Sequence, residues 1–209
     1  MHLNPAAFNA HLDRIGEAFR WRKAFACPCR NAQSGAANTK CTHCNGVGQI
    51  WADPVAATAG VAGQKVQLQW QQFGQYLHGD VVLTIQESSK MYELGQFDRI
   101  VMLNSTDYFS RGLVRGQDKI YAPVASITRV FWFVDGQIVE GSIPQVAQDG
   151  TLSWTSGAPP TGMQYSVTGT AFNEYFCWGQ YTTDRNFHSG ARLPRKVVAR
   201  KFDLFGRSG

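Results

Sequence analysis

Four of the chain's five cysteines lie close together near its start, at the spacing of a metal site: Cys27, Cys29, Cys41 and Cys44. The first two are separated by one residue, the last two by two residues, and eleven residues lie between the pairs. Pro28 favours an extended backbone, so its two neighbouring thiols point the same way and can share one ion. Gly46 and Gly48 let the chain turn tightly around the second pair and aim N–H groups at sulfur.

This ligand set predicts tetrahedral Zn²⁺ with Zn–S distances of ~2.3 Å. Four thiolates around zinc carry a net negative charge, and the segment between Ala18 and Trp51 contains no acidic residue but several cations. Four protein ligands leave no coordination position for a substrate, so we expect a structural ion. The small residues between the cysteine pairs cannot form a core, and the metal takes over that role.

Other chemistry for four cysteines is less well matched by this sequence. Disulfides are disfavoured because the chain shows no signal peptide and we expect it to be made in a reducing cytoplasm. A redox CxxC motif belongs at a helix start in a βαβ setting, which the pattern here does not predict. An iron–sulfur cluster also uses four cysteines, usually at other spacings, so zinc against iron stays open. His43 is a further potential ligand.

A helix is predicted over residues 4–24, ahead of the cysteines. Asn4 is a suitable N-cap, and Pro5 then occupies the first helical position. Apolar residues recur on one helical face, at spacings of four, three and four: Phe8, Leu12, Ile15 and Phe19. This stripe can pack on the chain's own domain or dock on a partner. Residues 1–51 are thus predicted to form a helix followed by a zinc-knuckle module.

The region after the cysteines has the period-two pattern of β-strands. Small residues, Pro and Gly over 52–63 predict a linker. Alternation begins in "KVQLQWQQF", continues in "DVVLTIQE", and is followed by "DRIVML", "APVASITRVFWFV", "QDGTLSW" and "MQYSVTGTAF". Asp135-Gly136 predicts a hairpin turn. We expect a mainly β fold, an antiparallel sandwich or barrel over 64–181.

Residues 182–209 are basic, are interrupted by Gly190 and Pro194, and are predicted to run as an extended C-terminal arm. The arm mixes cations with apolar residues, which suits addition of a strand to a neighbour's sheet edge. The residues expected to serve assembly here are Arg195, Lys196, Val197, Val198, Arg200, Lys201 and Phe202.

Charge is distributed in blocks along the chain. Residues 1–50 carry +4, residues 51–181 carry −4 and residues 182–209 carry +5, giving the net +5. Such blocks permit head-to-tail contacts between subunits or contacts with nucleic acid.

The sequence contains no phosphate-binding loop, GxSxG, HExxH or dinucleotide motif, so we expect no enzyme. No apolar run approaches the ~20 residues of a membrane span, so no membrane partner is expected. Cys177, flanked by aromatic residues, is expected to be a buried thiol.

Three stretches together resemble structural proteins of the tailed-bacteriophage head–tail interface, the neck or connector class. "CPCRNAQSG" with "CTHCNGVG" is similar to a small N-terminal zinc module of some neck and tail-associated proteins. "DGTLSWTSGAPPTGMQYSVTGTAF" resembles a hairpin pattern of phage structural β domains, and "GARLPRKVVARKFDLFG" resembles their basic closing segment. The stretches cover about a third of the chain and leave the first sheet unmatched.

The resemblance implies a non-catalytic virion protein that forms a homo-oligomeric ring around the DNA channel. Its expected partners are other neck or tail proteins of the virion, with non-specific contact to packaged DNA. A tail or baseplate position is a further alternative. A hypothesis of a different class is a nucleic-acid-binding zinc protein whose basic ends contact phosphates.

Overall fold

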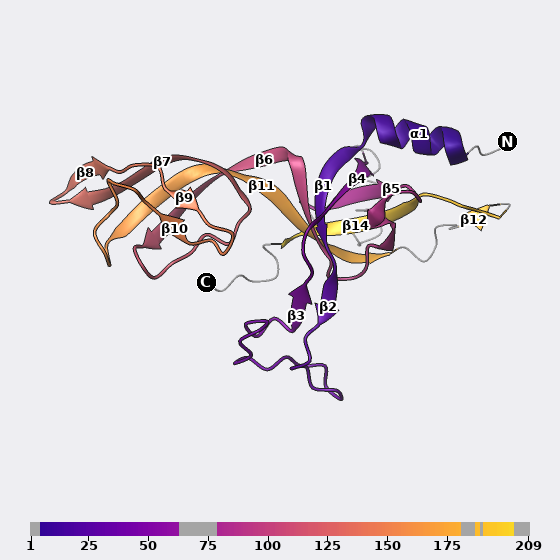
Figure 1. Ribbon diagram of the computed structural model, residues 1–209, viewed down its shortest axis with the longest axis horizontal. Coiled ribbons are helices and arrows are strands. Elements are labelled where there is room, and N and C mark those ends of the chain that lie inside the picture. The colour runs from indigo at the N-terminus through magenta and orange to yellow at the C-terminus, as the bar shows by residue number, and fades with distance from the viewer. Residues whose placement is uncertain (1–4, 63–78, 181–186, 189, 203–209) are drawn as a thin grey trace. The chain divides into compact units, whose positions relative to one another are not determined.

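The computed structural model describes residues 5–62, 79–180, 187–188 and 190–202 (Figure 1). The chain divides into two compact units, each with its own hydrophobic core. The first, here named the barrel unit, comprises Met1–Met102 with Tyr175–Phe205. The second, here named the hairpin unit, comprises Leu103–Glu174 among the described residues.

The barrel unit contains a helix, a short 3-10 helix and most of the strands. Its elements are α1 (Pro5–Ile15), β1 (Glu17–Arg22), β2 (Ala24–Ala26), β3 (Gln49–Trp51), β4 (Val55–Val61), β5 (Val81–Ile85), η1 (Lys90–Glu93), β12 (Phe187–His188), β13 (Ala191–Arg192) and β14 (Arg195–Lys201). Two long strands belong partly to each unit, namely β6 (Arg99–Val114) and β11 (Gln164–Gln180).

Six antiparallel strands close into a barrel in the order β14-β5-β4-β1-β6-β11, and β11 pairs back onto β14. Closure leaves these strands no open sheet edge along the paired residues. The interior is filled by side chains that are at most 1% exposed: Phe19, Leu83, Ile85, Met91, Leu94, Ile100 and Val197. The prediction of a mainly β antiparallel sandwich or barrel with an N-terminal helix is therefore confirmed, and the barrel is the form adopted.

The hairpin unit is a sheet in the order β6-β11-β7-β8, with a small two-stranded pair beside it. Its remaining elements are β7 (Val124–Val134), β8 (Gln137–Glu140), β9 (Gln145–Val146) and β10 (Leu152–Ser153). Asp135 and Gly136 join β7 to β8 with φ angles of 49° and 76°, the left-handed conformations that a tight hairpin turn requires. The predicted Asp-Gly turn is confirmed.

No helix in the described ranges has the length and apolarity needed to cross a membrane.

The prediction of one helix over residues 4–24 is wrong in its second half. The helix ends at Ile15, and Glu17–Arg22 form β1. Gly16 lies between the helix and the strand. A larger residue would not fit there, because a Cβ at this position would lie 2.6 Å from the carbonyl oxygen of Leu12. Phe19 and Trp21 then alternate with arginines and face the barrel interior, 1% and 8% exposed.

The prediction of a linker over 52–63 is also wrong. Val55–Val61 form β4, which pairs with both β1 and β5 inside the barrel. Its small residues are required by packing, since Ala59 is buried and a Cβ on Gly60 would lie 2.7 Å from Leu12 Cδ2. The following strand prediction, "KVQLQWQQF", lies outside the described residues.

The C-terminal segment is not a free arm over residues 195–201. These residues form β14, which pairs with β5 on one side and β11 on the other and so closes the barrel. Val197, Val198 and Ala199 are at most 1% exposed. The mixture of cations and apolar residues that favoured a connector therefore belongs to an internal barrel strand.

Candidate metal centre

The structure brings the four predicted cysteines together. Their sulfur atoms all lie within 4.8 Å of one another, with Cys27 Sγ 3.8 Å from Cys41 Sγ and Cys29 Sγ 3.5 Å from Cys44 Sγ. A tetrahedron with Zn–S bonds of ~2.3 Å has S–S edges of about 3.8 Å. These two pairs thus lie close to metal-sharing distance. All five cysteines of the chain are free thiols, so no disulfide competes for them.

Turns of the backbone position these thiols. The N–H of Cys27 donates to Gly48 O at 3.0 Å, which joins the two ends of the loop. The N–H of Asn45 donates to Cys41 O at 2.9 Å, and the N–H of Gly48 donates to Cys44 Sγ at 3.3 Å. Gly46 and Gly48 have φ angles of 81° and 78°, so the predicted glycine turn that directs an N–H at sulfur is present.

The surroundings of the thiols pull their pKa values apart. Backbone N–H groups of Cys44 and His43 lower the pKa of Cys41 to about 6. The N–H of Asn38 acts in the same direction on Cys29, but burial and the neighbouring sulfurs outweigh it and raise its pKa to about 12. Four thiols this close do not ionise together without a cation, because each thiolate repels the next. The donor set therefore fits a divalent metal ion.

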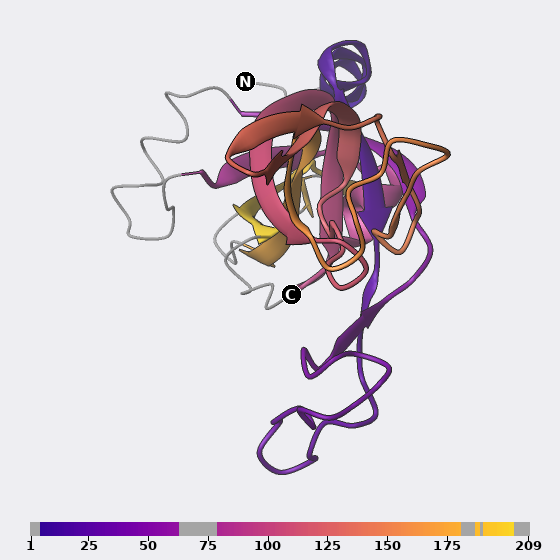
Figure 2. The same ribbon diagram turned by 90° about the vertical axis from the view of Figure 1, so that its left-hand side faces the viewer.

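The metal-site loop extends from the barrel on a short hairpin. Strands β2 and β3 pair in the register Ala24↔Trp51, Phe25↔Ile50 and Ala26↔Gln49. Figures 1 and 2 show this hairpin leading away from the barrel strands, with the loop at its far end. The residues that the structure describes contain this one group of three or more His, Cys, Asp or Glu side chains at metal-binding distance, and His43 is not part of it.

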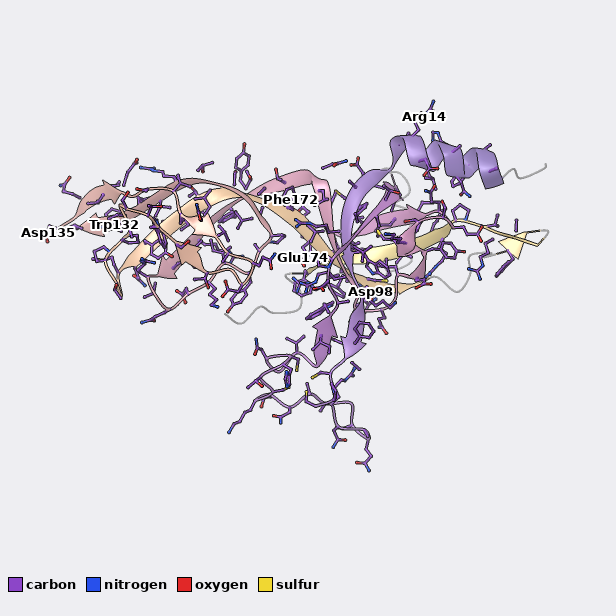
Figure 3. The ribbon with its side chains drawn as sticks, viewed as in Figure 1. Arg14, Asp98, Trp132, Asp135, Phe172 and Glu174 are labelled. Atoms are coloured by element: carbon purple, nitrogen blue, oxygen red, sulfur yellow. The ribbon has the colours of Figure 1, made fainter. Side chains whose placement is uncertain are left out.

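A buried carboxylate fixes the point where β1 continues into β2. The Asp98 side chain is 1% exposed and accepts hydrogen bonds from Trp21 Nε1 at 2.9 Å and from the backbone N–H groups of Ala24 and Gly95 at 2.8 Å each. Lys23 Nζ lies 3.3 Å from the same carboxylate. Figure 3 labels Asp98 at this junction. Asp98 could not be identified from the sequence, because a single acid inside a strand motif carries no distinguishing signal.

A cluster of rings anchors the other strand of the hairpin. Trp51 Nε1 donates to Phe97 O at 3.0 Å, and the Trp51 ring meets Phe202 edge to face at 5.9 Å. The guanidinium of Arg99 lies 4.9 Å from the Trp51 ring and 3.9 Å from the Phe202 ring. Phe202, expected to serve assembly, is instead buried in this cluster.

The residues predicted for assembly do not gather on one surface. Leu12 and Phe19 are buried, whereas Phe8 and Ile15 are 46% and 51% exposed. The structure thus separates the predicted helical stripe into a packed half and an exposed half. Only the exposed half is free to dock on a partner.

The predicted C-terminal contacts are largely internal as well. Arg195 donates to the carbonyl oxygens of Tyr92 and Leu94, and Arg200 lies 3.3 Å from the buried Asp80 carboxylate. Val197 and Val198 are core residues, Lys201 is partly buried, and Lys196 is exposed. Most of this set therefore stabilises the chain's own barrel.

Cys177 lies apart from the metal centre in the barrel core. It is 0% exposed, and burial, followed by the charge of Asp98, raises its pKa to about 12. A thiol in this state is a small apolar side chain and a poor nucleophile. The predicted buried thiol is confirmed.

No protein-family model matches this chain. The search of curated proteins likewise found no match.

Proposed function

We propose that this chain is a non-catalytic structural subunit of a tailed-phage virion, placed in the neck or connector at the head–tail interface, with a structural Zn²⁺ held by four cysteines. The four-thiol cluster carries the proposal, because it stands in the N-terminal motif that resembles the zinc module of neck and tail-associated proteins. The stretches "DGTLSWTSGAPPTGMQYSVTGTAF" and "GARLPRKVVARKFDLFG" follow it in the same order as the similar segments of that class.

Zinc is favoured over iron by the spacing of the cysteines and by the role that the loop requires. The loop between Cys29 and Cys41 is almost entirely exposed and has no hydrophobic core of its own. A tetrahedral ion with four protein ligands holds such a loop without offering a site for substrate. In this role zinc supplies folding energy to the module and takes no part in a reaction.

Elemental analysis tests the metal. Protein purified without chelator is expected to carry about one zinc per chain, and Cys41→Ser is expected to lose it. Cys177→Ala is the matched control, because it removes a thiol that lies outside the cluster. Protein without metal, iron in place of zinc, or zinc retained in Cys41→Ser would each contradict this assignment.

A nucleic-acid-binding zinc protein is the second candidate function. The observation in its favour is Phe25, an aromatic side chain that is 53% exposed on the β2–β3 hairpin, with exposed Arg30 and Lys40 on the adjoining metal-site loop. Exposed rings and cations are the usual surface for single-stranded nucleic acid. Binding of DNA that falls steeply with salt, and that Phe25→Ala abolishes, favours this candidate over the virion subunit.

Composition of purified particles tests the virion assignment. Quantitative mass spectrometry of phage particles that carry the coding gene is expected to find the chain in several copies per particle, as a ring requires. A chain present in infected cells but absent from particles refutes the proposal.

A further inference from the structure

We propose that the outer face of the β7–β8 hairpin is the surface by which one copy of this chain binds the barrel unit of the next copy. This inference rests on the proposed function, because it gives the ring its subunit contact. Since β14 is internal to the barrel, the C-terminal segment is not available as the connector that its composition favoured.

The two faces of this hairpin differ in what covers them. Val130 and Trp132 point into the core of the hairpin unit, and they are 1% and 7% exposed. The intervening residues point the other way, and Phe133 and Ile138, which are paired across the strands, are 58% and 54% exposed. Phe131 and Phe133 meet edge to face at 6.1 Å, which extends the apolar surface along β7.

This outer face, which we name the hairpin face, comprises Phe131, Phe133 and Ile138 and has a charged border. Arg129 Nε donates to Glu140 Oε1 at 2.9 Å, and its guanidinium lies 4.8 Å from the Phe131 ring. Asp135 occupies the tip of the hairpin, as labelled in Figure 3. An apolar centre with a polar rim is the usual anatomy of a protein–protein contact.

The edge of the sheet at this place is open as well. Among the described strands, β8 pairs with β7 alone. Its four residues, Gln137–Glu140, therefore present backbone donors and acceptors on the side away from β7. A neighbour that covers the hairpin face can also pair with this edge, which adds direction to an otherwise apolar contact.

Charge identifies the neighbour as the barrel unit of another copy. Residues 103–174 contain four basic and six acidic side chains, net −2, within a chain of net charge +5, so the rest of the chain carries +7. Glu140 is already paired with Arg129, so Asp135 at the tip supplies the uncompensated negative charge of the hairpin, whereas the barrel unit exposes Lys90 and Lys196. A contact between an acidic unit of one copy and a basic unit of the next is head-to-tail, the arrangement that closes into rings.

The test compares two variants of the full chain. Phe133→Ser combined with Ile138→Ser removes the apolar centre, and Tyr108→Ser is the control because this aromatic side chain is 90% exposed on β6 of the same unit. Light scattering after size-exclusion chromatography measures self-association over a range of concentrations and salt, and the thermal midpoint verifies folding. We expect the double variant to self-associate about 100-fold more weakly, at about tenfold for each apolar anchor, and the control to match wild type.

The outcomes separate this inference from the proposed function. Self-association of wild type that weakens with salt, together with a monomeric but folded double variant, supports the inference. A double variant that associates like wild type overturns it and leaves the virion assignment intact, as does wild-type association that salt leaves unchanged. Wild type that is monomeric throughout, with the double variant absent from particles, also overturns it and assigns the hairpin face to a different virion protein. Absence of wild type from particles refutes the proposed function instead.

Discussion

Replacing Asp98 by asparagine is expected to destabilise the barrel unit strongly while changing almost no volume. The carboxylate is 1% exposed and accepts hydrogen bonds from Trp21 Nε1, two backbone N–H groups and Lys23 Nζ. Oδ2 accepts from Trp21, Lys23 and Gly95, and Oδ1 accepts from the N–H of Ala24, so an amide NH₂ in place of either oxygen faces an N–H. Asparagine therefore loses the charge and at least one acceptor together.

The magnitude follows from the individual contacts. A hydrogen bond to a charged group contributes about 1.5–3 kcal/mol, and a buried donor left without an acceptor costs about 1–3 kcal/mol. The Lys23 side chain is 37% exposed, so the contribution of its ion pair is reduced by solvent screening. The sum, about 2.5–6 kcal/mol, spans the usual cost of about 3–5 kcal/mol for breaking a buried charge network.

Equilibrium unfolding in urea measures this change, with Asp149→Asn as the matched control. Asp149 is also paired with a lysine, at 2.6 Å, but its side chain is 58% exposed. The control is expected to change the free energy of unfolding far less than Asp98→Asn does, because solvent screens this exposed ion pair. If the free energy of unfolding of Asp98→Asn lies within about 1 kcal/mol of wild type, this carboxylate does not fix the β1–β2 junction.

Three further perturbations follow from the structure. Deleting residues 191–209 removes β14 and opens the barrel. Urea titration is therefore expected to show no cooperative unfolding transition for the barrel unit. A transition like that of wild type would show that β14 is not needed to close the barrel. Gly150→Ala is expected to cost about 1–3 kcal/mol, because φ is +82° and a Cβ would lie 2.3 Å from Ile120 O; an unchanged melting temperature contradicts this. The hydrogen bond from Lys119 holds the pKa of Asp149 below its usual value. The stability from this pair is therefore present at neutral pH and lost as pH falls through the depressed value, and Asp149→Asn should remove that acid dependence in pH-dependent melting.

Much of the β fold could be predicted from the sequence because its signals are local. Period-two alternation and an Asp-Gly turn depend on neighbouring residues, and both β5 and the β7–β8 turn form where they predict. The cysteine cluster was predictable for the same reason, since the ligands of each pair lie within one turn of chain. Local spacing carries this information without knowledge of the rest of the fold.

The errors arose where packing against distant residues decides the structure. The spacing of Phe8, Leu12, Ile15 and Phe19 fits a helix, but Phe19 is buried in the barrel core. The small residues of β4 are typical of a linker, yet Leu12 packs against them and requires their size. Strand β14 pairs with β5, which lies more than 100 residues earlier in the chain, and no local sequence pattern predicts this pairing.

A reconstruction of the head–tail junction in purified particles by electron cryomicroscopy tests the central claim most directly. We expect a ring of identical copies, each with a six-stranded barrel and with density for a metal ion among Cys27, Cys29, Cys41 and Cys44. A junction without this chain, or one that contains it with the four thiols metal-free, would contradict the proposed function.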